Sequence, residues 1–127
     1  MTGARVVVLD DEVLIAEYIA GELEDGGYDI VAVCRTPEDA VQAVARHAPD
    51  LVVLDVSLGR GGNGIEVGRE ISGGGGPALV FCSGTRPEEV EAEFPGCGVL
   101  MKPFTPEDLL RVVAETLARR GDGTGAT

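Results

Sequence analysis

Two patterns of hydrophobic and polar positions alternate along the chain. Short apolar runs of five to seven residues are separated by longer segments in which apolar residues recur every three or four positions. The first pattern is typical of strands buried in a sheet, and the second is typical of amphipathic helices. The short runs predict strands at residues 5–9, 28–34, 50–55, 78–83 and 97–102.

Helices are predicted between and after these strands. In the first helical segment, Ile15, Ile19 and Leu23 recur at intervals of four, which places them on one face. Two later segments begin with the letters TPED, where threonine is a typical N-cap and proline suits the first helical position. The acidic segment 87–94 has few apolar residues and is predicted to be weakly anchored. The helices are predicted at residues 12–25, 36–48, 64–71 and 105–120.

The order of these elements predicts the fold class. Strands that alternate with helices favour an α/β domain with a five-stranded parallel sheet and helices on both faces. A chain of 127 residues is long enough for one such domain. We expect the domain to occupy residues 1–120. We expect residues 121–127, GDGTGAT, to be disordered because they offer almost no apolar surface.

Charge and composition narrow the range of partners. The formal net charge of −12, from 22 acidic and 10 basic residues, argues against a nucleic-acid surface, which needs clustered lysine and arginine. The sequence shows no secretory signal and no apolar run of about 18 residues, so we expect a cytoplasmic protein that does not enter a membrane. The three cysteines share no C-x-x-C spacing, which argues against a zinc site or a disulfide framework.

Candidate chemistry gathers where the predicted strands end. Asp10 and Asp11 follow the first strand, and strands three, four and five end in Asp55, Ser83 and Lys102. The carboxyl ends of parallel strands form one edge of a sheet, and α/β proteins bind their ligands there. Lys102 is the only lysine among the ten basic residues. A flexible ammonium group therefore stands at a strand end in a chain that otherwise uses arginine.

These residue types indicate magnesium and phosphoryl chemistry. Carboxylates a few ångström apart repel by on the order of 4 kcal/mol per pair at an effective dielectric constant of about 20, so cations must lie among them. Carboxylate oxygens without histidine or thiolate ligands favour Mg²⁺, and Lys102 supplies a second cation. Asp55, which stands alone at the end of its strand, is the candidate nucleophile for attack on phosphorus.

The pattern resembles the receiver domain of two-component response regulators. The resemblance rests on VVVLDDE, PDLVVLDVSL, LVFCSG and LMKPF, in this order, and extends over about residues 4–120. It implies the strand order 2-1-3-4-5 of a flavodoxin-like receiver and a cis peptide bond between Lys102 and Pro103. The letters FCSG are similar to the Phe-Ala-Thr-Gly of one receiver subgroup.

The resemblance also assigns a role to each candidate residue. Asp55 would accept the phosphoryl group, Ser83 would hydrogen-bond to that group, and Lys102 would pair with it. The ligands of Mg²⁺ would be Asp10, largely through water, together with Asp11, Asp55 and the backbone carbonyl of Ser57. Such a protein is not an enzyme acting on other substrates, because it catalyses only its own phosphorylation and dephosphorylation.

Protein partners are implied on both sides of this reaction. The phosphoryl donor would be a phosphohistidine on a histidine kinase or a histidine phosphotransfer protein. Phosphorylation would change the surface formed by segment 87–94, the fifth strand and the last helix, and so control a downstream protein or a relay. Because no output domain follows the last helix, we expect a stand-alone receiver. The usual aromatic switch residue is Val99 here, so the rotamer change of a tyrosine or phenylalanine cannot operate.

Three other functions can be compared with this one. The letters GRGGNG at 59–64 match the dinucleotide fingerprint G-x-G-x-x-G, but they follow the third strand rather than the first, and no acidic residue ends the next strand. A flavodoxin-like carrier of FMN would need serine or threonine after the first strand, where this chain has two aspartates. A receiver-like interaction module that acts without phosphorylation stays open, because Val99 departs from the usual switch.

Overall fold

A computed structural model of the protein describes residues 3–59, 62–73, 75–84 and 88–125, with the backbone alone at 89 and 121–125. Residues 60 and 61 of the GRGGNG segment therefore lie outside the described residues. The strands are β1 (Arg5–Leu9), β2 (Asp29–Cys34), β3 (Leu51–Asp55), β4 (Ala78–Ser83) and β5 (Gly98–Met101). The helices are α1 (Val13–Asp25), α2 (Pro37–His47), α3 (Gly64–Ile71), α4 (Glu88–Glu93) and α5 (Pro106–Gly125).

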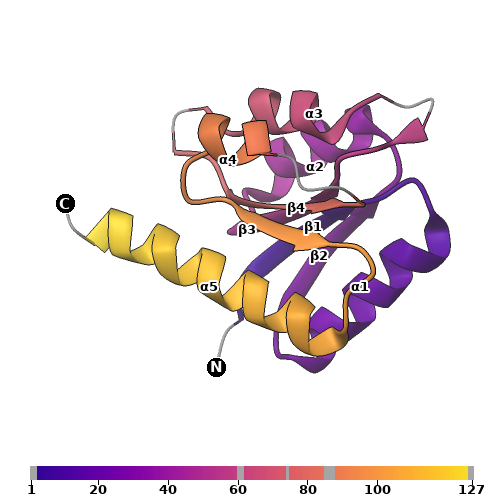
Figure 1. The fold of residues 1–127 in the computed structure, drawn as a ribbon, viewed down its shortest axis with the longest axis horizontal. Coiled ribbons are helices and arrows are strands. Elements are labelled where there is room, and N and C mark those ends of the chain that lie inside the picture. The colour runs from indigo at the N-terminus through magenta and orange to yellow at the C-terminus, as the bar shows by residue number, and fades with distance from the viewer. Residues whose placement is uncertain (1–2, 60–61, 74, 85–87, 126–127) are drawn as a thin grey trace.

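The five strands form one parallel sheet in the order β2-β1-β3-β4-β5. Helices α1 and α5 cover one face of the sheet, and α2, α3 and α4 lie on the other, as Figure 1 shows. The predicted fold class and strand order are therefore confirmed.

Alternation along the strands divides the core into two apolar layers. On β1, Val6 and Val8 pack toward α1 and α5, whereas Val7 and Leu9 pack toward α2 and α3. Strands β3 and β4 repeat this alternation, because successive side chains on a strand point to opposite faces. The three central strands are thus buried on both sides, which fixes the positions of the residues at their ends.

Side-chain caps set the starts of the helices. Thr36 Oγ1 accepts a hydrogen bond from the backbone nitrogen of Asp39 at 3.2 Å. At the second TPED segment, Thr105 Oγ1 accepts from the nitrogen of Asp108 at 3.0 Å, and the carboxylate of Asp108 accepts from the nitrogen of Thr105 at 3.1 Å. This reciprocal pair is a capping box. The capping role assigned to both threonines is therefore confirmed.

Two elements differ from expectation. Helix α5 continues to Gly125, whereas the pattern of apolar residues ends the helix at 120 and leaves 121–127 without structure. Extending a formed helix adds one hydrogen bond per residue without a new nucleus, so the backbone can continue the helix beyond the last apolar residue of the pattern. Helix α4 is anchored more firmly than its composition indicates, because Val90 and Phe94 are both buried in the core.

Close approach of α3 to the end of β3 requires glycine at position 64. A Cβ atom added to Gly64 would lie 2.1 Å from the carbonyl oxygen of Asp55. We expect Gly64→Ala to lower the free energy of unfolding in urea by roughly 2–4 kcal/mol. Gly21→Ala is the control, because a Cβ there meets nothing within 4 Å, and it should raise that free energy by up to about 1 kcal/mol. A Gly64→Ala protein as stable as the wild type would contradict the close approach.

Candidate functional site

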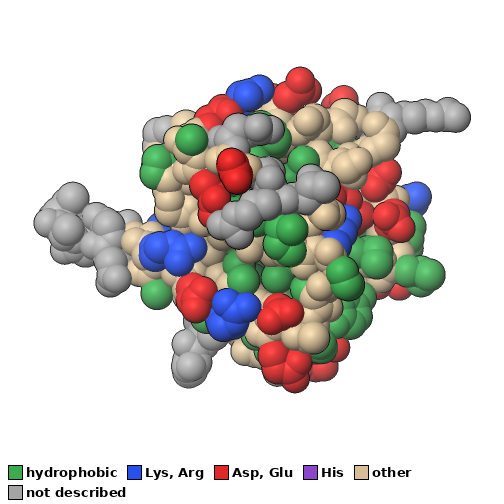
Figure 2. Space-filling view, viewed as in Figure 1, with side chains coloured by type: hydrophobic (Ala, Val, Ile, Leu, Met, Phe, Trp, Pro, Cys, Tyr) green, Lys and Arg blue, Asp and Glu red, His purple; other side chains and the backbone are tan. Residues whose placement is uncertain are grey.

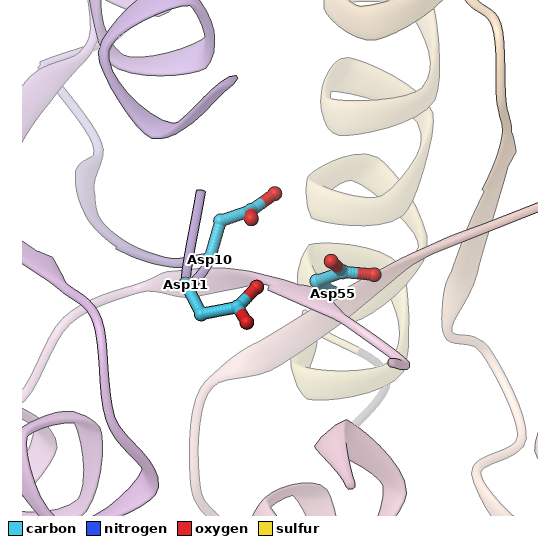
Figure 3. A group of neighbouring side chains, drawn as sticks. All are labelled: Asp10, Asp11 and Asp55. Atoms are coloured by element: carbon cyan, nitrogen blue, oxygen red, sulfur yellow. The ribbon is translucent and has the colours of Figure 1, made fainter. Parts of the chain in front are cut away.

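Strand register brings the three predicted carboxylates together. Leu9 of β1 pairs with Leu54 of β3, so the next residues, Asp10 and Asp55, lie side by side at the same edge of the sheet. Asp11 follows directly in the loop before α1. One carboxylate oxygen from each of the three residues lies within 4.8 Å of the others, and Figure 3 shows the three side chains around one space.

Asp10 is the most deeply buried of the three. Its side chain is 1% exposed, and its Oδ1 accepts a hydrogen bond from the backbone nitrogen of Glu12 at 2.9 Å. Its Oδ2 is buried and has no hydrogen-bond partner among the described residues. Burial raises the pKa of Asp10 from 3.8 to about 6, although the Glu12 N–H opposes the shift. When Asp10 is charged, its Oδ2 therefore has no partner among the described residues.

Asp55 has partners for one of its oxygens. It is 3% exposed, and its Oδ1 lies 3.2 Å from the ammonium nitrogen of Lys102 and accepts a hydrogen bond from the backbone nitrogen of Ser57 at 3.2 Å. Burial lowers the pKa of Lys102, but attraction by Asp55 and the hydrogen bond to it raise that pKa further, so the net shift is upward. The lysine therefore stays charged beside the carboxylate.

Ser83 and Lys102 reach the same edge from β4 and β5. Ser83 is buried and pairs with Met101 in the register of these strands, and its carbonyl oxygen accepts a hydrogen bond from the backbone nitrogen of Lys102 at 2.8 Å. The peptide bond between Lys102 and Pro103 is cis, as the resemblance implies. Val99, at the usual switch position, is half-buried on β5 opposite Phe81.

The loop after β3 adds one residue that sequence reasoning missed. Ser57 forms a bridge with Asn63, which holds the loop against the start of α3. Gly59 has φ +56°, and a Cβ there would lie 3.0 Å from the Oδ2 of Asp11. Glycine therefore allows the loop to approach Asp11. The glycine-rich letters were the available signal, and they were interpreted as a mobile loop beside the phosphorylation site without a contact between Gly59 and Asp11.

The donor set fits a hard divalent cation. The group found among the described residues consists of three carboxylates, with no histidine or cysteine ligand. One of its oxygens, Asp10 Oδ2, is buried without a hydrogen-bond partner among these residues. Mg²⁺ takes one or two carboxylates directly and keeps several waters. Asp10, Asp11 and Asp55 could hold such an ion, with the backbone carbonyl of Ser57 nearby in sequence.

Together, the strand order and an acidic edge facing a lysine define a receiver-type α/β domain. The family model of the response regulator receiver domain matches residues 6–114. The chain therefore belongs to this family and is a receiver domain of a two-component response regulator.

Curated relatives carry the same domain. The chain is 31% identical over 118 residues to the transcriptional regulatory protein PdtaR of Mycobacterium tuberculosis, covering 91% of this chain and 57% of that protein. It is 35% identical over 122 residues to the DNA-binding response regulator MtrA of the same species, covering 93% of this chain and 52% of MtrA. The chain thus spans about half the length of these relatives.

Solved structures are similar over nearly the whole chain. The response regulator PhyR of Brucella abortus matches with a TM-score of 0.87 and 25% identity, over 98% of this chain and 52% of PhyR. The chemotaxis response regulator CheY4 of Vibrio cholerae matches with a TM-score of 0.79 and 23% identity, over 91% of this chain and 99% of CheY4. The second likeness supports the fold alone. In the described part of the chain, no helix combines the length and apolar character needed to cross a membrane.

Burial of Asp10 should make stability depend on pH. Burial raises the pKa of Asp10 from its ordinary value of 3.8, which we take for the unfolded chain, to about 6 in the folded protein. The folded protein therefore binds this proton more tightly than the unfolded chain does. The contribution of Asp10 to stability is therefore present below about pH 4 and lost as pH rises through about 6. In EDTA, we expect Asp10→Asn to raise the free energy of unfolding at pH 7.5 by about 1–3 kcal/mol, and by much less at pH 4.

Urea unfolding at the two pH values measures this difference. Asp29→Asn removes one negative charge at an exposed position at the start of β2 and serves as the control. Equal effects of Asp10→Asn and Asp29→Asn at pH 7.5 would contradict the burial cost assigned to Asp10.

Proposed function

We propose that this receiver accepts a phosphoryl group on Asp55 in a Mg²⁺-dependent reaction, and that the donor is a phosphohistidine of a histidine kinase or a phosphotransfer protein. One observation carries the proposal: a buried aspartate pair in which Asp10 Oδ2 has no partner among the described residues, while Asp55 is paired with Lys102. Structural carboxylates are normally satisfied by hydrogen bonds. A pocket that retains this arrangement is suited to a cation and an incoming phosphoryl group.

The residues have distinct parts in the proposed transfer. Asp10, Asp11, Asp55 and the Ser57 carbonyl would hold Mg²⁺, which would supply positive charge to offset the charge on the phosphoryl oxygens. The Ser57 N–H and Lys102 both contact Oδ1 of Asp55, which fixes the orientation of its carboxylate. An oxygen of Asp55 forms a bond to phosphorus as the bond from phosphorus to the histidine nitrogen breaks, and that nitrogen keeps the electron pair.

Lys102 and Ser83 then respond to the new charge. The ammonium group of Lys102, already within 3.2 Å of Asp55, can pair with a phosphoryl oxygen after a small movement. The hydroxyl of Ser83 can donate a hydrogen bond to another oxygen. Because Ser83 ends β4 and Lys102 follows β5, both contacts act on the segments that lead to α4 and α5. In this way, phosphorylation would change the surface offered to a downstream protein or relay.

The surface beside the site suits a partner that brings a histidine. Three apolar side chains of α1 reach solvent there: Val13, Leu14 and Tyr18, of which Leu14 is 80% exposed. A cleft of about 380 Å³ next to them is lined by Glu12, Ile15, Tyr18, Lys102, Pro103 and Phe104. We place the docked kinase or phosphotransfer protein on this surface, since it adjoins Lys102 and therefore Asp55.

The interaction module that works without phosphorylation is the competing function. Val99 favours it, because the aromatic switch is missing. The buried acidic set argues for phosphorylation, because an interaction module gains nothing from a destabilising group at Asp10. We therefore retain phosphorylation as the proposed function.

Incubation with acetyl phosphate and Mg²⁺, followed by intact mass measurement, tests the proposal. We expect an increase of about 80 Da in the wild type, the mass of one phosphoryl group, and none in Asp55→Asn or in EDTA. Asp29→Asn should behave as the wild type. Lys102→Arg should react at least about tenfold more slowly, because a planar guanidinium does not reproduce the ammonium contact. A folded wild type that gains no mass would favour the interaction module.

A further inference from the structure

A second cleft lies at the edge of the sheet opposite the three aspartates. Its volume is about 350 Å³, which falls within the range of roughly 300–1,000 Å³ for small-molecule sites. It is bounded by the loop before β4, the loop before β5 and the C-terminal half of α5. None of its lining residues belongs to the site around Asp55.

Two glycines pack closely against neighbouring helices at this end of the sheet. A Cβ atom on Gly76, which lines the cleft, would lie 2.3 Å from the carbonyl oxygen of Ile71 in α3, and one on Gly98, at the start of β5, would lie 2.3 Å from Thr116 Oγ1 in α5. Gly96, which also lines the cleft, has φ +86°. Gly76 is therefore held against the end of α3, and the start of β5 is held against α5.

Hydrogen bonds hold the guanidinium group of Arg119 at the cleft through its Nε and Nη2 atoms. Its Nε donates to the carbonyl oxygen of Gly96 at 3.3 Å, and its Nη2 donates to the carbonyl oxygen of Cys97 at 3.2 Å and to Thr116 Oγ1 at 3.3 Å. Its Nη1 makes no hydrogen bond to the described residues. Guanidinium carries five N–H donors in a planar fork, so this one is held in place with two donors left for a ligand.

The described lining residues of the cleft carry a net positive charge, from Arg119 and Arg120 against Glu93. Arg120 also lines it and donates from Nη2 to the carbonyl oxygen of Gly76 at 3.3 Å. Among the described lining residues, Glu93 is the one acid, and both its oxygens bond to Arg69, at 2.5 and 3.0 Å. Glu91 acts electrostatically on Cys97 but does not line the cleft. Figure 2 shows basic side chains over the C-terminal half of α5, in a chain whose net charge is −12.

We propose that this cleft binds a small organic anion. Its acidic group would be held by Arg119 and Arg120, since planar guanidinium groups suit carboxylate and phosphate oxygens. Its apolar body would lie against Pro77, Leu79 and Phe94, which line the same cleft. A ligand in this position would contact both Phe94, directly after α4, and Arg119 and Arg120 on α5.

Protein NMR titrations with benzoate, phenyl phosphate and benzyl alcohol, all in EDTA, test the proposal. We expect both anions to give saturable shifts at the amides of Ala78, Gly96 and Cys97, and benzyl alcohol to bind at least about tenfold more weakly. The stronger of the two anions identifies the acidic group. Shifts confined to the amides around Asp55, or no saturation by either anion below about 10 mM, would overturn the proposal.

Substitutions of single arginines test whether Arg119 and Arg120, rather than other basic residues of α5, bind the anion. Arg119→Gln and Arg120→Gln should each weaken binding of the stronger anion by roughly tenfold. Arg111→Gln is the matched control, since Arg111 pairs with Asp108 on the same helix and does not line the cleft. Arg120 also lines the cleft and donates to the carbonyl oxygen of Gly76, so Arg120→Gln is a second variant that keeps the test informative if Arg119→Gln disturbs the fold. Unchanged affinity in Arg120→Gln would also overturn the proposal.

Discussion

Two buried carboxylates, Asp10 and Asp55, stand at neighbouring strand ends, and their mutual repulsion constrains the rest of that edge of the sheet. The register of β1 and β3 places them side by side, and Asp11 brings a third carboxylate within 4.8 Å. Lys102 balances part of this charge through Asp55. Asp10 keeps a buried oxygen that no described residue satisfies. Such an arrangement costs stability, and it makes physical sense where a cation and a phosphoryl group complete it.

The fold supplies this arrangement through parallel strands buried on both faces. Because β1, β3, β4 and β5 run in the same direction, the residues that follow them meet at one edge. Apolar layers on both faces fix the three central strands, and Ser57 forms a bridge with Asn63, the N-cap residue of α3. Burial of Asp10 therefore costs stability locally, and the apolar core on either side of the sheet offsets this cost.

Local patterns in the sequence were sufficient to predict most of this arrangement. Apolar runs predicted the strands, and TPED predicted two helix starts. The polar residues at the ends of four of the five runs predicted the candidate site, because the carboxyl ends of parallel strands lie at one edge of the sheet. The length of α5, the close approach of Gly59 to Asp11 and the clamp of Arg119 on Gly96 and Cys97 were not predictable in this way. Each depends on which distant segments touch, and a single sequence gives no direct signal of that kind.

An NMR titration with Mg²⁺ at pH 7.5 tests the central claim most directly, which is that the buried carboxylates form an incomplete cation site. The account predicts saturable shifts at the amides of Asp10, Asp11, Asp55 and Ser57 in the wild type. It also predicts a loss of affinity of at least about tenfold in Asp10→Asn, with Asp29→Asn unchanged. Shifts that never saturate, or equal affinity in Asp10→Asn and the wild type, would contradict it.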